Sequence, residues 1–452
     1  MPSRCGVGIS ACIRPSLIAV LITGLIRAGQ VPGTLPPPAA APPSNGPLTL
    51  AQAEAIAFKN HPQIATAQSL ASVASENVTE ARAPYYPTID GEITGSQGLY
   101  LSRLGAGSLA ASALFNRFGA GLQATQLITD FGRTHNLVAN SKYQEQAANQ
   151  TTQATIYDVA IGVNRAYYGV LEAQSYVQVA NETVHARQTL TDQVSALFNA
   201  KLKSQVDLSF AQVNLSEAQL LLLRSQDAVK RAYADLSRAM GLDQPVAYQL
   251  AESPAPPAPP PAPETLVADA VQNRPELKQL RLQVQGAQHF EQAEADLKRP
   301  NISFIGVGGG LPYLDQNPRV APHEYEAAAV NVDIPIFNGH LFTAREQAAH
   351  YQTLAAEQRV RNMQQQIERD VRAAWVSAST AYQRIPVTEE LLKQAQLALD
   401  LAQGRYNLGL ASIVEITQAQ LALTQAQIEN VSARYEYQVA YAELQYATGA
   451  LR

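Results

Sequence analysis

The segment FNAKLKSQVDLSFAQ, residues 198–212, returns 208 positions later as YNLGLASIVEITQAQ, residues 406–420. Identical or similar residues fill equivalent places in the two segments: Asn199 and Asn407, Ser204 and Ser412, Asp207 and Glu415, Ala211-Gln212 and Ala419-Gln420. Long stretches rich in Ala, Leu and Gln flank each segment. We therefore predict that each segment contains a short turn between two long antiparallel helices.

Apolar residues in the flanking stretches are spaced alternately three and four positions apart. After the first turn they are Leu208, Ala211, Leu215, Ala218 and Leu222, and after the second Ile416, Ala419, Leu423 and Ala426. A sustained period of 3.5 predicts coiled-coil packing, and the recurrent Ala lets the helices approach closely. From about Arg133 to Lys201 the first long helix would extend for roughly 100 Å at 1.5 Å per residue. Pro386 lies inside the second long helix and is expected to kink or interrupt it.

The similarity extends over most of the chain as an internal duplication. The first copy covers residues 48–243 and the second residues 264–452, and the Pro-rich residues 244–263 are expected to form a semi-rigid linker between them. Asn60-His-Pro62 and Asn273-Arg-Pro275 occupy the same place in the two copies. Because proline disfavours helix in the preceding residue, these motifs are expected to break or kink the first helix of each copy.

Four short stretches change to the period of two that is typical of strands: about 88–100, 119–130, 301–310 and 327–337. Aromatic residues lie near their predicted ends, where an interfacial girdle of a membrane barrel would lie: Tyr85, Tyr86, Tyr100, Phe115, Phe118 and Tyr313. Soluble hairpins show the same alternation, so both interpretations stay open. Four strands cannot close a barrel in lipid, whereas a trimer would supply about twelve.

The N-terminus has the features of a secretory signal. Arg4 and Arg14 precede the apolar stretch Leu17–Ile26, which small residues follow, so residues 1–29 are predicted to be a cleaved signal peptide. A single anchoring helix is the alternative, but the apolar stretch is short for a membrane span. Residues 30–47, rich in Pro and Ala, are expected to be an extended linker.

Composition and motifs argue against several classes of protein. The net charge of −5 lacks the basic excess of a nucleic-acid-binding protein, and no apolar run outside the N-terminus is long enough for a spanning helix. Cys5 and Cys12 both precede the apolar core of the predicted signal, so cleavage would leave no cysteine. The scattered histidines have no metal-ligand spacing, and no cofactor or catalytic motif is convincing. Residues 105–110 match a dinucleotide fingerprint only formally, and Trp375 is expected to pack in the core.

Together these features resemble the TolC-type outer-membrane efflux protein family over about residues 48–451. The resemblance rests on the duplication, the two Asn-x-Pro motifs, Pro87 and Pro300 before strands, Asp130-Phe-Gly132 and Phe337-Asn-Gly339 after them, and the turn at 407–416. It implies a mainly α chain with a transmembrane β part, in which a homotrimer forms a twelve-stranded β-barrel continued by a twelve-helix α-barrel. The implied partners are a periplasmic adaptor, an inner-membrane pump and outer-membrane lipid, with no nucleic acid.

The resemblance also suggests where the functional residues lie. The family closes its periplasmic end with an acidic ring, and in this chain Asp207 and Glu415 fall at such positions, with Gln418 where a second carboxylate can occur. Carboxylates that converge around a pore repel one another and attract cations. The simpler interpretation is a solvated charge at a helix end. The helix tips are expected to dock the adaptor. Their residues are Lys201, Lys203, Ser204, Gly409, Leu410 and Ser412.

Three functions remain to be compared. The first is a passive outer-membrane duct for small molecules in a tripartite efflux system. The second is a duct for type I protein secretion, which the fold does not separate from the first. The third is a periplasmic coiled-coil scaffold without a pore. An enzyme is the least favoured class, because no catalytic constellation is present.

Overall fold

A computed structural model describes residues 46–96, 117–252, 260–314 and 323–451. The predicted signal peptide, both cysteines and residues 30–45 of the N-terminal linker lie outside these ranges. So do Tyr100, Phe115 and the glycine-rich motif at 105–110. The description below concerns the compact unit that begins at Pro43.

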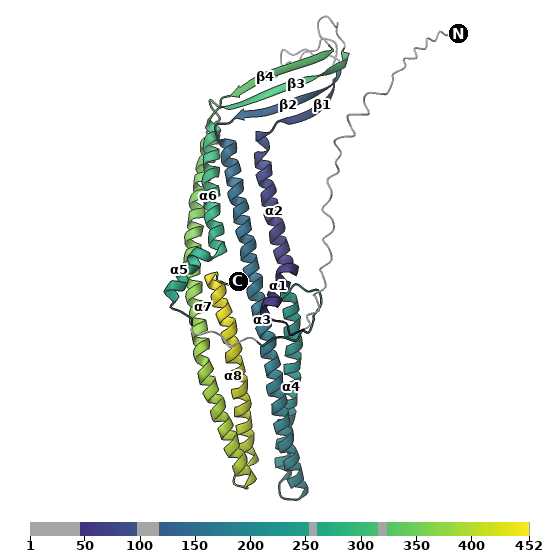
Figure 1. The fold of residues 1–452 in the computed structure, drawn as a ribbon, viewed down its shortest axis with the longest axis vertical. Coiled ribbons are helices and arrows are strands. Elements are labelled where there is room, and N and C mark those ends of the chain that lie inside the picture. The colour runs from purple at the N-terminus through teal and green to yellow at the C-terminus, as the bar shows by residue number, and fades with distance from the viewer. Residues whose placement is uncertain (1–45, 97–116, 253–259, 315–322, 452) are drawn as a thin grey trace, which may run out of the picture. The chain divides into compact units, whose positions relative to one another are not determined.

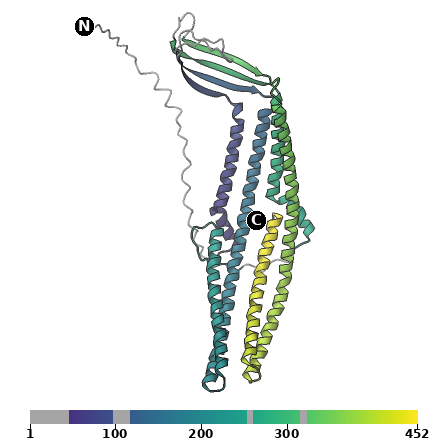
Figure 2. The ribbon, with the colours of Figure 1, turned by 180° about the vertical axis from the view of Figure 1, so that it is seen from behind.

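Two helical hairpins dominate this unit (Figures 1 and 2). Helix α3, Arg133–Asn199, turns into α4, Gln205–Ala239, and we name this pair hairpin 1. Helix α7, Leu341–Asn407, turns into α8, Ile413–Thr448, and forms hairpin 2. Both α3 and α7 have 67 residues, or about 100 Å at 1.5 Å per residue. The predicted long helices and their turns are confirmed.

Shorter helices continue alongside the long ones toward the sheet. In the first copy α1, Leu50–Asn60, breaks at His61 and α2 follows over Pro62–Arg82. In the second copy α5, Pro263–Asn273, breaks at Arg274 and α6 follows over Pro275–Ala295. The Asn-x-Pro motifs thus separate two helices, because each proline takes the first helical position, where no N–H is needed. Short 3₁₀ turns, Ala83–Tyr85 and Asp296–Lys298, then lead into the strands.

Small residues fill the seams inside each hairpin. Ala378 and Ala381 of α7 pack with Tyr437, Ala440 and Leu444 of α8, and all five are buried. This close packing is what the alternation of Ala with larger residues predicts. The expected interruption of α7 at Pro386 is wrong, since one helix runs through it. Proline removes one backbone hydrogen bond, and the packing of α7 against α8 holds the helix together.

The four strands form one antiparallel sheet in the order β1-β2-β3-β4. They are β1 Thr88–Ser96, β2 Arg117–Thr129, β3 Asn301–Leu314 and β4 Glu324–Asp333. The central β2–β3 pair joins the two copies, whereas β1 and β4 are edges. Strand β3 extends beyond the predicted end at 310, and β4 ends four residues before the predicted 337. Alternation of Ile334 and Ile336 suggested a longer strand, but Pro335 has no N–H for a ladder.

The pleat makes one face of the sheet mainly apolar, with Gln126, Glu324 and Glu326 among the exceptions, and the other mainly polar, with Ile305 and Val307 among the exceptions. The register places Ile89, Leu122, Phe304 and Val330 on the same face, with Ile93, Ala124 and Val332. Asp90, Gln123, Ser303 and Asn331 lie on the other. On the apolar face Ile93 is 75% exposed and Leu122 62% exposed. A soluble hairpin buries its apolar face, so this arrangement favours contact with lipid.

The segment between the copies is held by two equivalent aromatic residues. The Tyr167 hydroxyl donates to the carbonyls of Ala251, at 2.6 Å, and Leu48, at 2.9 Å. Trp375, which takes the same place in the second copy, donates its indole N–H to the carbonyl of Pro261 at 2.8 Å. Trp375 is only partly buried against Ala378 and Ala381, so the core-packing prediction is partly right and the bond to the linker is additional.

Candidate functional site

The tip of hairpin 1 is a five-residue turn closed by a capping box. Lys201 adopts a left-handed backbone, with φ at 60°. The Ser204 hydroxyl oxygen accepts from the backbone N–H of Asp207 at 3.2 Å, and the Asp207 carboxylate accepts from the Ser204 backbone N–H at 3.0 Å and from its hydroxyl at 2.8 Å. The bonds from Ser204 lower the pKa of Asp207. Asp207 is therefore ionised and fixed at the start of α4, where negative charge also favours the helix dipole.

The tip of hairpin 2 uses glycine and an ion pair. Gly409 takes the left-handed position, with φ at 73°, and the Ser412 hydroxyl caps α8 by accepting from the backbone N–H of Glu415 at 3.4 Å. The Glu415 Oε1 lies 3.1 Å from Nε of Arg405, on the last turn of α7. Leu410 and Gln418 are exposed. This pairing places a cation beside the carboxylate predicted to line an aperture.

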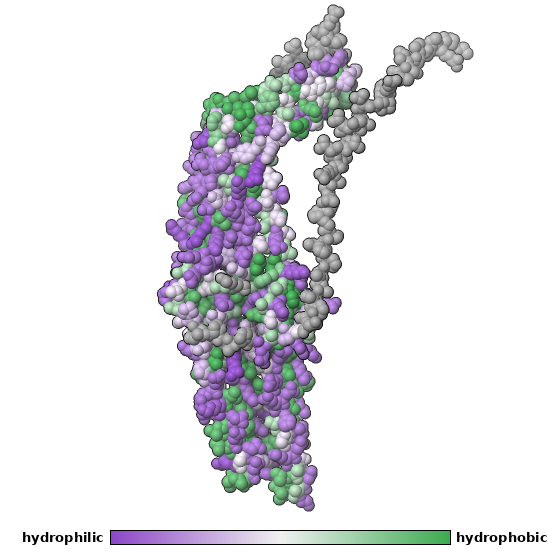
Figure 3. Space-filling view, in the orientation of Figure 1, coloured by the Kyte–Doolittle hydropathy of each residue, from purple (hydrophilic) through white to green (hydrophobic). Residues whose placement is uncertain are grey.

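The two tips pack on one apolar cluster, which we name the tip cluster. It comprises Leu190, Val194, Leu208 and Ala211 of hairpin 1 and Tyr406, Ile413 and Ile416 of hairpin 2. Nζ of Lys203 stands 4.8 Å from the ring centroid of Tyr406, a cation–π contact between the hairpins. Burial and the nearby charge of Asp207 raise the pKa of Tyr406. Figure 3 shows hydrophobic residues at these tips, near the sheet and around the level of α1 and α5, with mainly hydrophilic residues on the helices between these regions.

The structure brings some of the predicted residues together and leaves others apart. Lys203 and Asp207 meet Tyr406 across the tips, whereas no hydrogen bond or ion pair within the described ranges joins Asp207 to Glu415. Sequence reasoning missed Arg405, and it gave Tyr406 no role beyond its place in the repeated segment. A basic residue in the last turn of a helix, next to a Gly turn, is a signal for Arg405. Whether the predicted residues line an aperture or dock a partner stays a prediction.

Among the described residues, no group of three or more His, Cys, Asp or Glu side chains is placed to hold a metal ion. Within the same ranges, no helix combines the length and apolarity needed to cross a membrane.

The family model for outer membrane efflux proteins matches residues 55–242 and 266–450. The chain therefore belongs to the outer membrane efflux protein family, and the two matched stretches agree with the internal duplication. As a member of this family it is an outer-membrane efflux channel and not an enzyme.

Individual relatives are similar at low identity but over most of their length. The outer membrane protein TolC of Salmonella enteritidis is 23% identical over 427 residues, which cover 90% of this chain and 84% of the relative. The toluene efflux pump outer membrane protein TtgI of Pseudomonas putida is 23% identical over 78% of this chain and 77% of its own. The solved outer membrane channel CmeC of Campylobacter jejuni has a TM-score of 0.73 at 16% identity, with 89% and 85% covered.

Proposed function

We propose that three copies of this chain form a passive duct that carries small molecules across the periplasm and the outer membrane. The exposed apolar face of the sheet carries this proposal, together with the two strand edges that the single chain leaves unpaired. In lipid, an unpaired edge leaves backbone N–H and C=O groups unsatisfied. Pairing β4 of one chain with β1 of the next chain removes every edge, and three chains give a closed barrel of about twelve strands.

The helices of three chains complete the periplasmic part of the duct. Each chain supplies the four helices of its two hairpins, so three chains give the twelve helices of the α-barrel. Asp207 and Glu415 then occur three times each around the periplasmic end, with Gln418 one turn further along α8. In this assembly they form the aperture, and their charge favours cations.

The hairpin tips are the proposed docking surface for a periplasmic adaptor. The two turns carry Lys201, Lys203 and Ser204 in hairpin 1 and Gly409, Leu410 and Ser412 in hairpin 2. Five of these six residues are exposed, and Lys203 is half-buried. The adaptor links the duct to an inner-membrane pump, which selects the cargo. A cleaved signal peptide at residues 1–29 exports the chain to the outer membrane.

A duct for protein secretion is the second candidate, because similar relatives include one named for it. The alkaline protease secretion protein AprF of Pseudomonas aeruginosa is 23% identical over 71% of this chain. Both functions need the same fold, so the geometry of the duct does not choose between them.

The proposal is tested on the purified full chain in detergent and in planar bilayers. We expect a trimer by light scattering and cation-preferring pores of uniform conductance. A monodisperse monomer without conductance would contradict the duct and favour a scaffold, which carbonate would also wash from outer membranes. Cross-linking in native membranes, followed by identification of the attached pump, then separates small-molecule efflux from protein secretion.

A further inference from the structure

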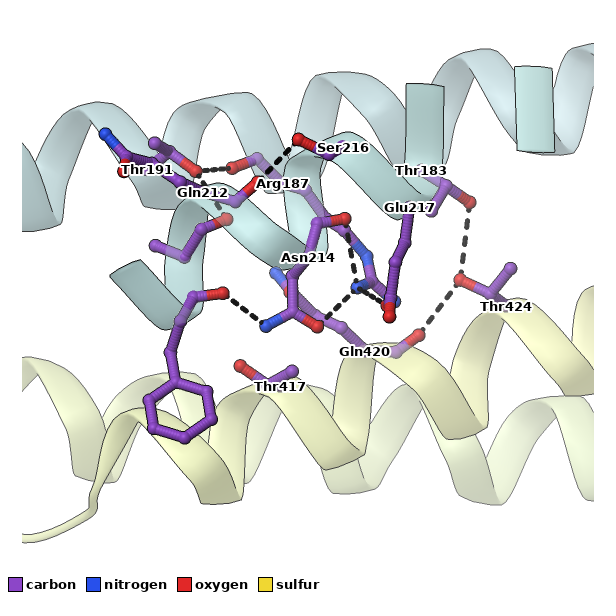
Figure 4. A network of polar contacts seen from close by, with 12 residues as sticks. Thr183, Arg187, Thr191, Gln212, Asn214, Ser216, Glu217, Thr417, Gln420 and Thr424 are labelled. Atoms are coloured by element: carbon purple, nitrogen blue, oxygen red, sulfur yellow. Dashed lines mark hydrogen bonds and ion pairs between the residues drawn. The ribbon is translucent and has the colours of Figure 1, made fainter. Parts of the chain in front are cut away.

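A layer of polar side chains from α3, α4 and α8 lies next to the tip cluster, on its side toward the sheet, and interrupts the apolar packing between the two hairpins (Figure 4). The hydroxyls of Thr183 and Thr424 lie 3.3 Å apart between α3 and α8. Arg187 lies one turn nearer the tip than Thr183 on α3, and Gln420 lies one turn nearer the tip than Thr424 on α8. A cavity of about 200 Å³ lies among these four residues.

Arg187 is a buried cation whose Nε has no hydrogen-bond partner within the described residues. Its residue is only 5% exposed, and Nη1 donates to the Asn214 side-chain oxygen at 2.8 Å and to the Asn214 carbonyl at 3.3 Å. The carboxylate of Glu217 lies 4.0 Å from Nη1 and is largely exposed. No protein atom of the described ranges accepts a hydrogen bond from Nε. Leaving a donor of a charged group unsatisfied is costly in a buried seam.

Gln420 presents the complementary deficit from the other hairpin. It is 7% exposed, and within the described part of the chain no donor reaches its Oε1. Both Arg187 and Gln420 line the same cavity. A donor without an acceptor and an acceptor without a donor therefore belong to residues that line one half-open cavity, beside Leu399 and Leu423, and each comes from a different hairpin.

We propose that this cavity is a built water site, in which ordered water bridges Arg187 Nε and Gln420 Oε1 and so links hairpin 1 to hairpin 2. Water both donates and accepts, which matches the two atoms. The cavity offers room for several molecules at about 30 Å³ each, and the Thr183 and Thr424 hydroxyls supply further partners. Glu182 at the rim and Glu217 beside the guanidinium disfavour a bound anion. This inference does not depend on the transport function.

The direct test is a high-resolution structure of the wild-type trimer or monomer. We expect solvent density within hydrogen-bond distance of both Nε of Arg187 and Oε1 of Gln420. A direct bond between the two side chains with the cavity closed would overturn the proposal. Anomalous density after a bromide soak would assign an anion to the cavity and would overturn it equally.

A double-mutant cycle measures the bridge in solution. Arg187→Met and Gln420→Leu alone are each expected to lower Tm by about 2–4 °C, and together by clearly less than the sum, because the pair removes both polar ends at once. Additive losses would overturn the proposal. Gln420→Glu keeps an acceptor oxygen and should retain the solvent density even if the apolar variants fold poorly. Thr388→Val with Asn430→Leu, a directly bonded pair inside hairpin 2, is the control that should couple without solvent density.

Discussion

Gly241, just after α4, lies directly against His61, the residue at which α1 breaks from α2. A side-chain carbon on Gly241 would stand 2.7 Å from the Cα of His61, and its backbone φ is 71°. The second copy repeats the arrangement, since Gly449 after α8 would bring a side-chain carbon within 3.3 Å of the Arg274 backbone nitrogen. The glycine at the end of each repeat thus packs against the residue that separates the first two helices of the same repeat. As a result α4 lies end to end with α2, and both run alongside α3.

This contact predicts unequal effects of two otherwise similar substitutions. Gly241→Ala and Gly409→Ala both place a side chain at positive φ, at a cost of about 1–2 kcal/mol. Gly409 has open space around it, whereas Gly241 is crowded by backbone, so Gly241→Ala should cost about 1–3 kcal/mol more. Thermal unfolding of the two variants in detergent checks this. Equal losses would mean that the His61 backbone moves aside.

The sheet predicts a second pair of contrasting variants. Leu122→Arg puts a charge near the middle of β2 on the apolar face, where arginine in a membrane barrel costs about 2–4 kcal/mol. Gln123→Arg puts the same charge one residue away on the polar face and should leave assembly intact. Outer-membrane fractionation and trimer yield measure the difference. If both variants assemble equally well, the apolar face does not contact lipid.

The capping box at hairpin 1 predicts a pH-dependent stability. Hydrogen bonds from Ser204 lower the pKa of Asp207 from its ordinary value of 3.8, so the contribution of the carboxylate is complete above that value and is lost as the pH falls through the folded-state pKa. Asp207→Asn should therefore be less stable than wild type at pH 6, and the difference should shrink below pH 3.8. Urea unfolding across this range tests it. In the Ser204→Ala background the pH dependence of the difference should be smaller but not absent, because the backbone N–H of residue 204 still donates to the carboxylate.

The aperture proposal predicts the behaviour of the two carboxylates in a bilayer. Asp207→Ala combined with Glu415→Ala removes up to six charges from a trimer, so resting conductance should rise and block by multivalent cations should weaken. Single-channel recording measures both quantities. Unchanged conductance and block would show that these carboxylates do not line the constriction.

The ion pair at hairpin 2 allows a finer test. Arg405→Gln frees Glu415 from its partner at 3.1 Å, and since both side chains are partly exposed, stability should change by only about 0–1 kcal/mol. Cation block should become stronger, because the carboxylate is no longer neutralised. Arg384→Gln breaks pairs with Glu429 and Glu436 further up hairpin 2 and should leave block unchanged. Equal effects of the two variants would place Glu415 away from the pore.

Much of the fold follows from sequence periodicity because it is local and doubled. The 3.5 period specifies the hairpins, and the Asn-x-Pro motifs specify the helix breaks, since both depend on residues close in the chain. Predictions from single residues were less secure. Pro386 does not end α7, because contacts along α8 compensate for one lost hydrogen bond, and the strand pattern ran past Pro335, where pairing stops.

The site was predicted less completely for a physical reason. Asp207 and Glu415 occupy equivalent positions in the two repeats, and this equivalence can be seen in the sequence alone. Their partners are not equivalent: Asp207 bonds Ser204, whereas Glu415 reaches across the turn to Arg405. The contact of Lys203 with Tyr406, and the cavity between Arg187 and Gln420, depend on how two separate hairpins pack, which no local pattern specifies.

The central β2–β3 pair has one further consequence. Within a chain it joins the second strand of the first repeat to the first strand of the second repeat. Between chains, the proposed β4–β1 pair joins the second strand of the second repeat to the first strand of the first repeat. Every boundary around the ring is then of one kind, and six near-equivalent units alternate around it. The covalent linker sets only which units travel together, so two half-chains produced separately and divided within residues 253–259 should still assemble into one closed ring.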